Sequence, residues 1–235
     1  MIKLKFERDK ICEACQKGKQ TKNSFKQKNV VSTSRPLELF HMNLFGPSRF
    51  MSIGGNYYGL VIIDDFSRFT WNLFIIPKDH AFGAFKRLAN VIQNEKNCTI
   101  VATKIDHRGE FWKEKFERFG EIFGIKHNFS APRTLQQNGI VERKNRALEE
   151  LLRTLLNETN LPKYFLNDVV NITSYVWNRV LIRPILKKTP YEFFKGRKLN
   201  ILHLRAFGYK CFILNNDKDN LGKFDAKADE GIFLD

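Results

Sequence analysis

The chain has 235 residues, 43% of them hydrophobic and 28% charged, which allows one well-buried domain and excludes a small disulfide scaffold. The sequence has no apolar run of about 18 residues and begins with the charged stretch MIKLKFERDK, so neither a membrane partner nor secretion is expected, and an intracellular protein is predicted. Lys and Arg outnumber Asp and Glu by 40 to 25, and this excess of +15 favours a nucleic-acid partner over the alternative of charge kept for solubility.

The first 35 residues are predicted to form a basic arm outside the core, because they carry ten Lys or Arg against three acids. Only Cys12 and Cys15 of the four cysteines have a metal-like spacing. The others, Cys98 and Cys211, are too scattered to suggest a disulfide framework, so a reducing compartment is expected.

From Pro36 onward the pattern is typical of an α/β domain. The runs LELFHMNLF, YYGLVIID and TWNLFII predict three successive strands, because they are rich in β-branched and aromatic residues and are separated by turn-forming segments. Residues 78–96 have apolar side chains at intervals of three and four, which predicts a helix before the strand TIVATKID. A second helical stretch at 112–123 leads into the strand IKHNF. The order β-β-β-α-β-α-β predicts a mixed five-stranded sheet with flanking helices.

The second half of the chain is predicted to be mainly helical. A long amphipathic helix is expected at 140–158, and another at 162–182, opened by Pro162. The segment HLRAFGYKCFIL then returns to a strand pattern, and GIFLD follows at the end of the chain. This last β unit is expected to be incomplete.

Three polar positions fall where the predicted topology brings elements together. Asn43 lies within the first strand, Asp106 at the end of the fourth and Glu142 in the first turn of the long helix, with 35 residues between Asp106 and Glu142. Acids at such places can hold two divalent ions about 4 Å apart for phosphodiester chemistry, and carboxylate oxygens suit Mg²⁺. The alternative is that Asp106 begins a turn and Glu142 favours a helix N-terminus.

Four sequence strings, HMNLFGP, VIIDDFSRFTW, IDHRGEF and QQNGIVERKNR, resemble in order the landmarks of the integrase in Copia-type LTR-retrotransposon Pol polyproteins. CEACQKGKQ before them and KTPYEFFKGRKLNILHLRAFGYKCFI after them also resemble that family, so the match covers nearly the whole chain. The resemblance implies an RNase H-like mixed five-stranded sheet with flanking helices and a D-D-35-E triad. It also implies an enzyme that trims the DNA ends of the element and joins them to target DNA.

The triad that the resemblance implies is incomplete in this sequence. Asp106 and Glu142 match the second aspartate and the glutamate, and would bind Mg²⁺ or Mn²⁺, but Asn43 stands where the family has its first aspartate. An amide oxygen can ligate a metal, yet it supplies no negative charge to offset two dications. A weakened two-metal site and severely reduced catalysis are therefore expected.

Asp64 and Asp65 are the nearest acids that might substitute for the missing carboxylate. A hairpin centred near residue 51 would place residue 59 opposite Asn43, and Asp64 five positions further on. At about 3.3 Å per residue this is roughly 17 Å, too far for a shared metal. The two acids are instead expected to cap the turn into DFSRF.

By resemblance, a loop and the helix that follows it contact the element DNA. These residues are Gln137, Asn138, Arg143, Lys144 and Asn145. Contacts of this kind with the DNA backbone supply affinity and salt dependence without reading sequence. For the neighbouring Arg146, an ion pair with Glu142 at i, i+4 is an equal alternative.

The flanking segments resemble incomplete modules. Cys12 and Cys15 resemble the second half of a His-His-Cys-Cys zinc module whose histidines are absent here, so zinc is not expected in this chain alone. The segment from His203 resembles the first strands of an SH3-like β-domain. We therefore divide the chain into an arm at 1–35, an RNase H-like integrase core with C-terminal helices at 36–200 and a truncated SH3-like β segment at 201–235.

The leading functional hypothesis is an integrase catalytic-core region that binds the element ends and target DNA, as a homo-multimer and in the nucleus. The alternative is a non-catalytic DNA-binding or assembly module, decayed or retained by the host, because the basic arm and loop would serve it equally well. A third hypothesis, an unrelated RNase H-like nuclease, shares the metal chemistry but leaves QQNGIVERKNR unexplained.

Overall fold

The fold is that of a computed structural model in which residues 33–48, 51–105, 118–129, 139–159, 161–183, 186–200, 205, 207–215, 224 and 226–234 are described. Within these residues, no helix is both long enough and apolar enough to span a bilayer.

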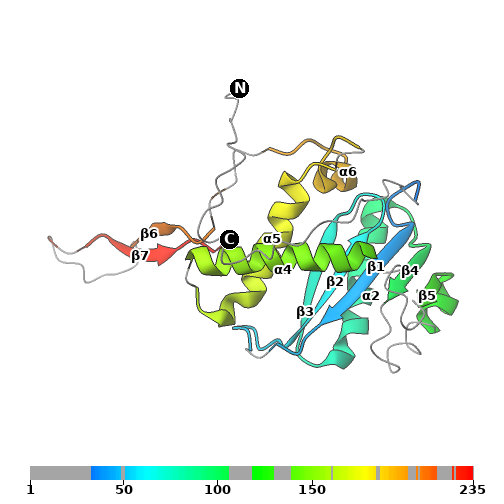
Figure 1. Cartoon of the computed structure of the whole chain (residues 1–235), viewed down its shortest axis with the longest axis horizontal. Helices are drawn as coiled ribbons and strands as arrows, with labels where there is room; N and C mark the ends of the chain where they lie inside the picture. The colour runs from blue at the N-terminus through cyan, green and yellow to red at the C-terminus, as the bar shows by residue number, and fades with distance from the viewer. Residues whose placement is uncertain are drawn as a thin grey trace.

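Five strands form one mixed sheet, as the sequence predicts (Figure 1). The strands are β1 (Leu39–Phe45), β2 (Tyr58–Asp64), β3 (Thr70–Ile75), β4 (Ala102–Ile105) and β5 (Lys126–Phe129). Their order is β3-β2-β1-β4-β5, with β2 antiparallel to β1 and β3, and with β4 parallel to β1 and β5. β1 is therefore the central strand, with neighbours on both sides.

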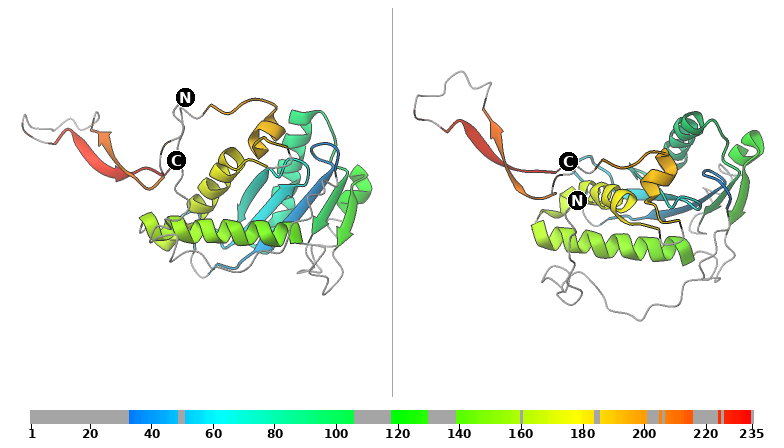
Figure 2. Two further views of the ribbon diagram at one scale, coloured as in Figure 1. Left: turned by 45° about the horizontal axis from the view of Figure 1, so that its top comes forward. Right: turned by 90° about the horizontal axis from the view of Figure 1, so that it is seen from above.

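Helices cover both faces of this sheet (Figure 2). α2 (Ala81–Lys96) lies on one face, whereas α4 (Gly139–Thr159) and α5 (Leu166–Val180) lie on the other. Short 3-10 turns, η1 (Lys78–His80) and η2 (Lys163–Phe165), precede α2 and α5, and residues 118–123 are helical before β5. The predicted arrangement of a mixed sheet with flanking helices is confirmed.

Alternation along β1 assigns its side chains to the two faces. Phe40 and Met42 are fully buried in the apolar cluster on the α2 side. Successive side chains of a strand point to opposite faces, so His41 and Asn43 point toward α4 and α5. The central strand therefore contributes apolar side chains to one layer and polar side chains to the other.

The α2 side holds an aromatic core. Phe85 of α2 is fully buried there. The Trp71 ring packs against Phe40, Phe69 and Phe194, with ring centroids 5.7, 4.7 and 4.9 Å away. Tilted and edge-to-face pairs at these separations are favourable beyond the area they bury.

One short helix, α6 (Pro190–Lys195), was not predicted from the sequence. It begins with a capping box, in which Thr189 Oγ1 accepts from the Glu192 N–H at 3.2 Å and Glu192 Oε2 accepts from the Thr189 N–H at 3.0 Å. The signal was present as Thr-Pro-Tyr-Glu, with Pro190 at the first helical position. α6 carries Phe194 into the α2-side core, where it is 1% exposed.

Beyond α6, β6 (Lys210–Leu214) and β7 (Ala228–Ile232) form a separate two-stranded antiparallel sheet. This pair extends away from the five-stranded sheet (Figures 1 and 2). Large apolar side chains on it, such as Phe212 at 67% exposed, are open to solvent. The sequence prediction of strands here is confirmed, and the assignment to an SH3-like unit stays a prediction.

Candidate functional site

Asn43 lies near the middle of β1, on the face that α4 and α5 cover. It pairs with Val61 of β2, and Val61 packs with Leu148 of α4. Residues directly opposite each other in antiparallel strands point to the same face, so the half-buried Asn43 amide is on the α4 side. The Asn72–Val61 pair continues the same row into β3.

The register of β1 and β2 differs from the sequence prediction. Gly59 pairs with Phe45, and Asn43 lies opposite Val61 rather than residue 59. The hairpin is centred one residue later because the Phe45 ring occupies the space beside Gly59, where a Cβ atom would overlap it. Asp64 is therefore three register positions from Asn43 and not five, or about 10 Å along the strand.

The Asp64 carboxylate is already used in the turn after β2. Its Oδ1 accepts from the Leu37 N–H at 2.9 Å, and its Oδ2 accepts from the N–H and hydroxyl of Ser67 at 2.8 and 2.5 Å. Burial raises the pKa of Asp64, and these hydrogen bonds oppose the rise. The predicted turn-capping role is confirmed, and both carboxylate oxygens of Asp64 accept hydrogen bonds within this turn.

Asp65 is the centre of a buried polar network. Its Oδ1 lies 3.0 Å from His41 Nε2 and 3.1 Å from Arg68 Nη1, and its Oδ2 accepts from the Thr33 hydroxyl at 3.0 Å. Its N–H donates to the Leu39 carbonyl at 2.9 Å. The network joins the turn after β2 to the first half of β1, where His41 lies two residues before Asn43.

Lys144 lies inside the interface of α4 and α5. It is 7% exposed, its Nζ lies 3.9 Å from the centroid of the Trp177 ring, and this Nζ makes no hydrogen bond with the described residues. Burial lowers the pKa of Lys144 well below its usual range, and the charge of Arg68 lowers it further.

The expectation that Lys144 contacts DNA stays a prediction, and in this structure its side chain is buried rather than on the outer face of α4. Residues on a helix turn by about 100° each, so position 144 lies on the far side of the helix from position 142. It shares the inward face with Leu148, one turn later, which packs on β2. In this structure the ammonium faces Trp177 and not solvent.

Two more cations lie beside the Asp65 network. Lys104 of β4 pairs in register with His41, and an Arg183 N–H donates to the Phe66 carbonyl. Burial lowers the pKa of both cations, and the negative charge of Asp65 works against it. Two partly desolvated positive charges therefore lie around Asp65, and that of Lys104 is two register positions from Asn43.

Of the other two triad positions, the structure describes only the backbone of Glu142. The described part of β4 ends at Ile105, which pairs with Met42, the residue before Asn43. Asp106 itself lies outside the described residues. Glu142 belongs to the first turn of α4, and α4 packs against β1, but the Glu142 side chain is outside the description.

Most of the predicted DNA and zinc residues also fall outside the description. These are Gln137, Asn138, Cys12 and Cys15 as whole residues, and Arg143 and Asn145 as side chains on α4. Their roles stay predictions.

Within the described ranges no three His, Cys, Asp or Glu side chains are grouped so as to hold a metal ion. Asn43 offers one amide oxygen, a donor that hard cations accept but that leaves their charge unbalanced. Asn43 therefore contributes a neutral ligand, and the nearby carboxylates of Asp64 and Asp65 are held by other partners.

Several residues of the site were not predicted to take part in it, among them His41, Arg68 and Trp177. The prediction places His41 in the first strand, as the structure does, but gives it no contact in the site. The available signal was its spacing of two from Asn43, which puts both side chains on one sheet face. The contacts with Asp65 and Lys144 join segments distant in sequence, and no local pattern indicates them.

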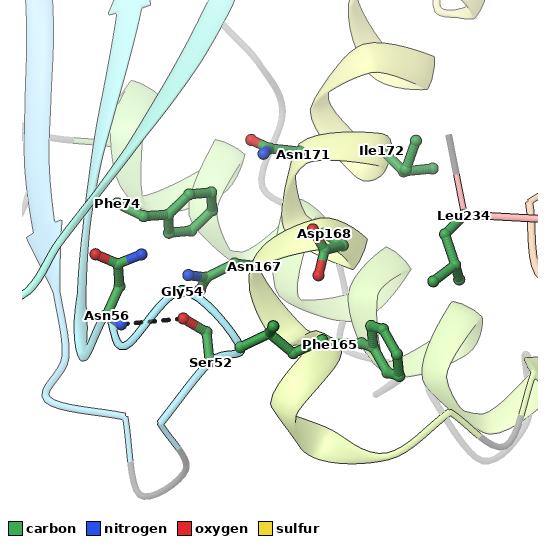
Figure 3. Close-up of a pocket in the computed structure, with 11 residues that line it drawn as sticks. Ser52, Gly54, Asn56, Phe74, Phe165, Asn167, Asp168, Asn171, Ile172 and Leu234 are labelled. Carbon is green, nitrogen blue, oxygen red and sulfur yellow. Dashed lines mark hydrogen bonds between the residues drawn. The ribbon is translucent and has the colours of Figure 1, made fainter.

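A separate hollow of about 580 Å³ lies between the loop at 52–56, Phe74 of β3 and the start of α5 (Figure 3). Amides of Asn56, Asn167 and Asn171 line it, and Asp168 is the one ionisable group among the described residues of its wall. None of the predicted site residues is part of it. We assign no chemistry to this hollow.

Comparison with known sequences gives related polyproteins but no matching protein-family model. The chain is 31% identical over 225 residues, 96% of its length, to the Retrovirus-related Pol polyprotein from transposon TNT 1-94 of Nicotiana tabacum. It is 31% identical over 224 residues, 95% of its length, to that from transposon RE1 of Arabidopsis thaliana. The chain spans only 17% and 15% of these polyproteins. The resemblance to retrotransposon Pol polyproteins is confirmed.

Comparison with solved structures gives integrase folds. One is the simian T-cell lymphotropic virus intasome in complex with PP2A regulatory subunit B56 gamma, with TM-score 0.57, 14% identity, and 94% of this chain and 76% of that chain covered. Another is the HTLV-2 integrase catalytic core domain in complex with magnesium, with TM-score 0.50, 20% identity, and 68% and 97% covered. At these identities the likeness concerns the fold, and the RNase H-like prediction is confirmed.

Proposed function

Because the chain belongs with the integrase catalytic-core region of retrovirus-related Pol polyproteins, we propose that its ancestral reaction is metal-dependent joining of element DNA to target DNA. We further propose that this activity is impaired here, since Asn43 replaces the first triad aspartate. The observation that carries this proposal is the position of Asn43. It lies on the central strand, on the face covered by α4, beside the end of β4.

Divalent metal would be held by the carboxylates of Asp106 and Glu142 with the amide oxygen of Asn43. Bound Mg²⁺ would activate the attacking oxygen and stabilise the leaving oxygen of a phosphodiester. The protein's own part is to supply negative charge and fix the ligands. With Asn43, one negative charge is missing, while Lys104 of β4 lies in register with His41, two residues before Asn43. Binding of two dications is therefore weakened.

DNA is the proposed partner, at both the element ends and the target. The net charge of +15 and the sequence QQNGIVERKNR at the start of α4 support this partner. A multimer working in the nucleus of the host cell is proposed on the same basis, because the matched solved structures include an intasome and a trimeric catalytic core. The second candidate function is a non-catalytic DNA-binding or assembly module, and the neutral amide of Asn43 favours it.

The test is strand joining on short duplex oligonucleotides with Mg²⁺ or Mn²⁺. The unmodified chain is expected to give near-background product. Asn43→Asp is expected to raise the amount of product by on the order of a hundredfold, because loss of one electrostatic stabilising group from an active site typically lowers the rate by about that factor. The double variant Asn43→Asp with Glu142→Gln should return to background. Asn43→Ser, which is small and neutral, is the matched control and should stay inactive.

Metal affinity gives a second measurement that does not need turnover. Mn²⁺ titration followed by electron paramagnetic resonance should show tighter binding in Asn43→Asp than in the unmodified chain. Robust joining by the unmodified chain would overturn the impaired-triad proposal. Absence of joining in Asn43→Asp, together with intact salt-sensitive DNA binding, would favour the non-catalytic module.

A further inference from the structure

The segment from the end of α5 to the residues after α6 is strongly basic. Between residues 179 and 198 it has seven Lys or Arg and a single acid, Glu192. The Glu192 carboxylate is committed to the capping box of α6. The cations are Arg179, Arg183, Lys187, Lys188, Lys195, Arg197 and Lys198.

Two of these arginines are held against tyrosine rings, in a group that we call the arginine–tyrosine stack (Tyr175, Arg179, Tyr191 and Arg197). The Arg179 guanidinium carbon lies 3.5 Å from the Tyr175 ring centroid and 4.7 Å from that of Tyr191. The Arg197 guanidinium carbon lies 5.8 Å from the Tyr191 centroid, and its Nε donates to the Tyr191 hydroxyl at 2.9 Å. α5 and α6 are thereby joined at their neighbouring ends (Figure 1).

These contacts restrain both guanidinium groups and leave further N–H donors on each. Arg179 uses one N–H for the Tyr175 carbonyl at 3.4 Å, and Arg197 uses Nε for Tyr191. A guanidinium has five donors in a planar fork that matches the oxygens of a phosphate. The stack therefore presents preorganised donors, and less side-chain freedom is lost when an anion binds.

The charges of the stack are not balanced by the described part of the protein. Neither Arg179 nor Arg197 forms an ion pair with a carboxylate there, whereas Lys195, in the same segment, pairs with Glu95 at 2.7 Å. Burial lowers the pKa of Arg179, and the charge of Arg197 lowers it further while the two tyrosines oppose this. Like charges held together in this way are stabilised by an external anion.

We propose that the arginine–tyrosine stack, together with the adjacent exposed Lys198, binds the phosphodiester backbone of duplex DNA. Each tyrosine ring already has a guanidinium group beside it, and Tyr191 is buried, so the donors of the two arginines rather than free rings face a ligand. Contacts of such donors with the DNA backbone carry no sequence preference. Carboxylates of an acidic protein also fit the planar guanidinium fork, so an acidic protein partner is one outcome of the test below. The inference rests on the proposed function for the choice of DNA, and adds a surface distant in sequence from QQNGIVERKNR.

The experiment measures binding of the full chain to a short DNA duplex of arbitrary sequence by fluorescence anisotropy over a range of NaCl concentrations. Arg197→Gln with Lys198→Gln removes two exposed charges. It should weaken binding on the order of tenfold near 0.1 M salt and reduce the slope of log K against log salt by roughly 1.8. Lys86→Gln with Arg87→Gln, on the exposed side of α2, removes the same charge and should change the slope far less.

Two more variants separate orientation from charge. Arg197→Lys keeps the charge but loses the planar fork, and Tyr191→Phe keeps the ring but loses the hydroxyl that accepts from Arg197. Both variants should weaken binding severalfold. The slope of log K against log salt should be nearly unchanged in both, because neither variant alters the number of cations. Circular dichroism confirms that each variant is folded.

Equal slopes for the Arg197–Lys198 variant and the α2 control would overturn the proposal. So would competition by polyglutamate as effective as that by unlabelled duplex, which would indicate an acidic protein partner. Failure here is distinguishable from failure of the proposed function, because strand joining by Asn43→Asp is measured on a chain in which Arg197 and Lys198 are unchanged. Conversely, an inactive Asn43→Asp chain leaves the binding experiment fully interpretable.

Discussion

The two faces of the central sheet are built from the same strands but differ in chemistry. The α2 side packs Phe40, Met42 and Phe85 in a continuous apolar cluster. The α4 side has a smaller apolar cluster around Val61 and Leu148, beside the buried network of Asp65. Buried polar and charged groups cost free energy unless they are paired. The α2 side therefore supplies stability, and the α4 side accepts a cost to place polar groups near Asn43.

The comparison shows how one strand serves both purposes. Each residue step along β1 changes the face, so an apolar layer and a polar site can share one backbone. The polar layer is also where Lys144 has no hydrogen-bonding partner among the described residues. The difference between the faces can be measured by substitutions that affect one side at a time.

Truncation of the apolar side should have the largest effect. Phe85→Ala is expected to lower the free energy of unfolding by about 3–5 kcal/mol, because it leaves a cavity in a fully buried aromatic cluster. Leu148→Ala, on the α4 side, should cost less, since its apolar cluster is smaller. Urea denaturation measures both, and a larger loss for Leu148→Ala would contradict the comparison.

Removal of the central charge on the polar side should come next. Asp65→Asn is expected to cost about 3 kcal/mol, because Arg68 and its neighbours would keep their buried charge without a carboxylate. The matched control is Asp79→Asn, at an exposed position, which should be within about 0.5 kcal/mol of the unmodified chain. Thermal unfolding followed by circular dichroism gives the comparison, and equal shifts would show that the network does not stabilise the fold.

Replacement of the buried Lys144 ammonium should raise, rather than lower, the free energy of unfolding. The pKa of Lys144 is lowered in the folded chain, so between that pKa and the ordinary value of 10.5 the unfolded state binds more protons, and stability rises with pH. Lys144→Met should remove this rise and stabilise the chain near neutral pH by about 1–3 kcal/mol. Urea unfolding from neutral to alkaline pH measures the slope. Lys86→Met is the exposed control, and an unchanged slope in Lys144→Met would refute the assignment.

Loss of the cap of α6 should have the smallest effect. Thr189→Ala removes the side chain that accepts from Glu192, and is expected to cost about 1 kcal/mol, because the first turn of α6 loses a partner for its N–H groups. Thr189→Ser keeps the hydroxyl and should be nearly neutral. Thermal unfolding detects the difference, and a loss in Thr189→Ser equal to that in Thr189→Ala would exclude capping as the cause.

The strands and long helices were predictable because their signals are local. The runs around Met42 and Ile62 and the helical spacing at 78–96 each identify an element that the structure contains. The register of the first hairpin was not predictable to the residue, because it depends on the Phe45 ring lying over Gly59. The capping box at Thr189 has a local signal, Thr-Pro-Tyr-Glu, although the prediction includes no helix at this position.

The sequence by itself determined the family, the mixed α/β architecture and the replacement of an acid by Asn43, because these depend on residue identity and spacing along the chain. Only the tertiary structure decided that Lys144 is buried against Trp177, that Asp65 joins His41 to Arg68, and that Arg179 and Arg197 share the ring of Tyr191. The physical reason is that burial and pairing join side chains far apart in sequence. Their free energies depend on the environment that the fold creates, and not on local pattern.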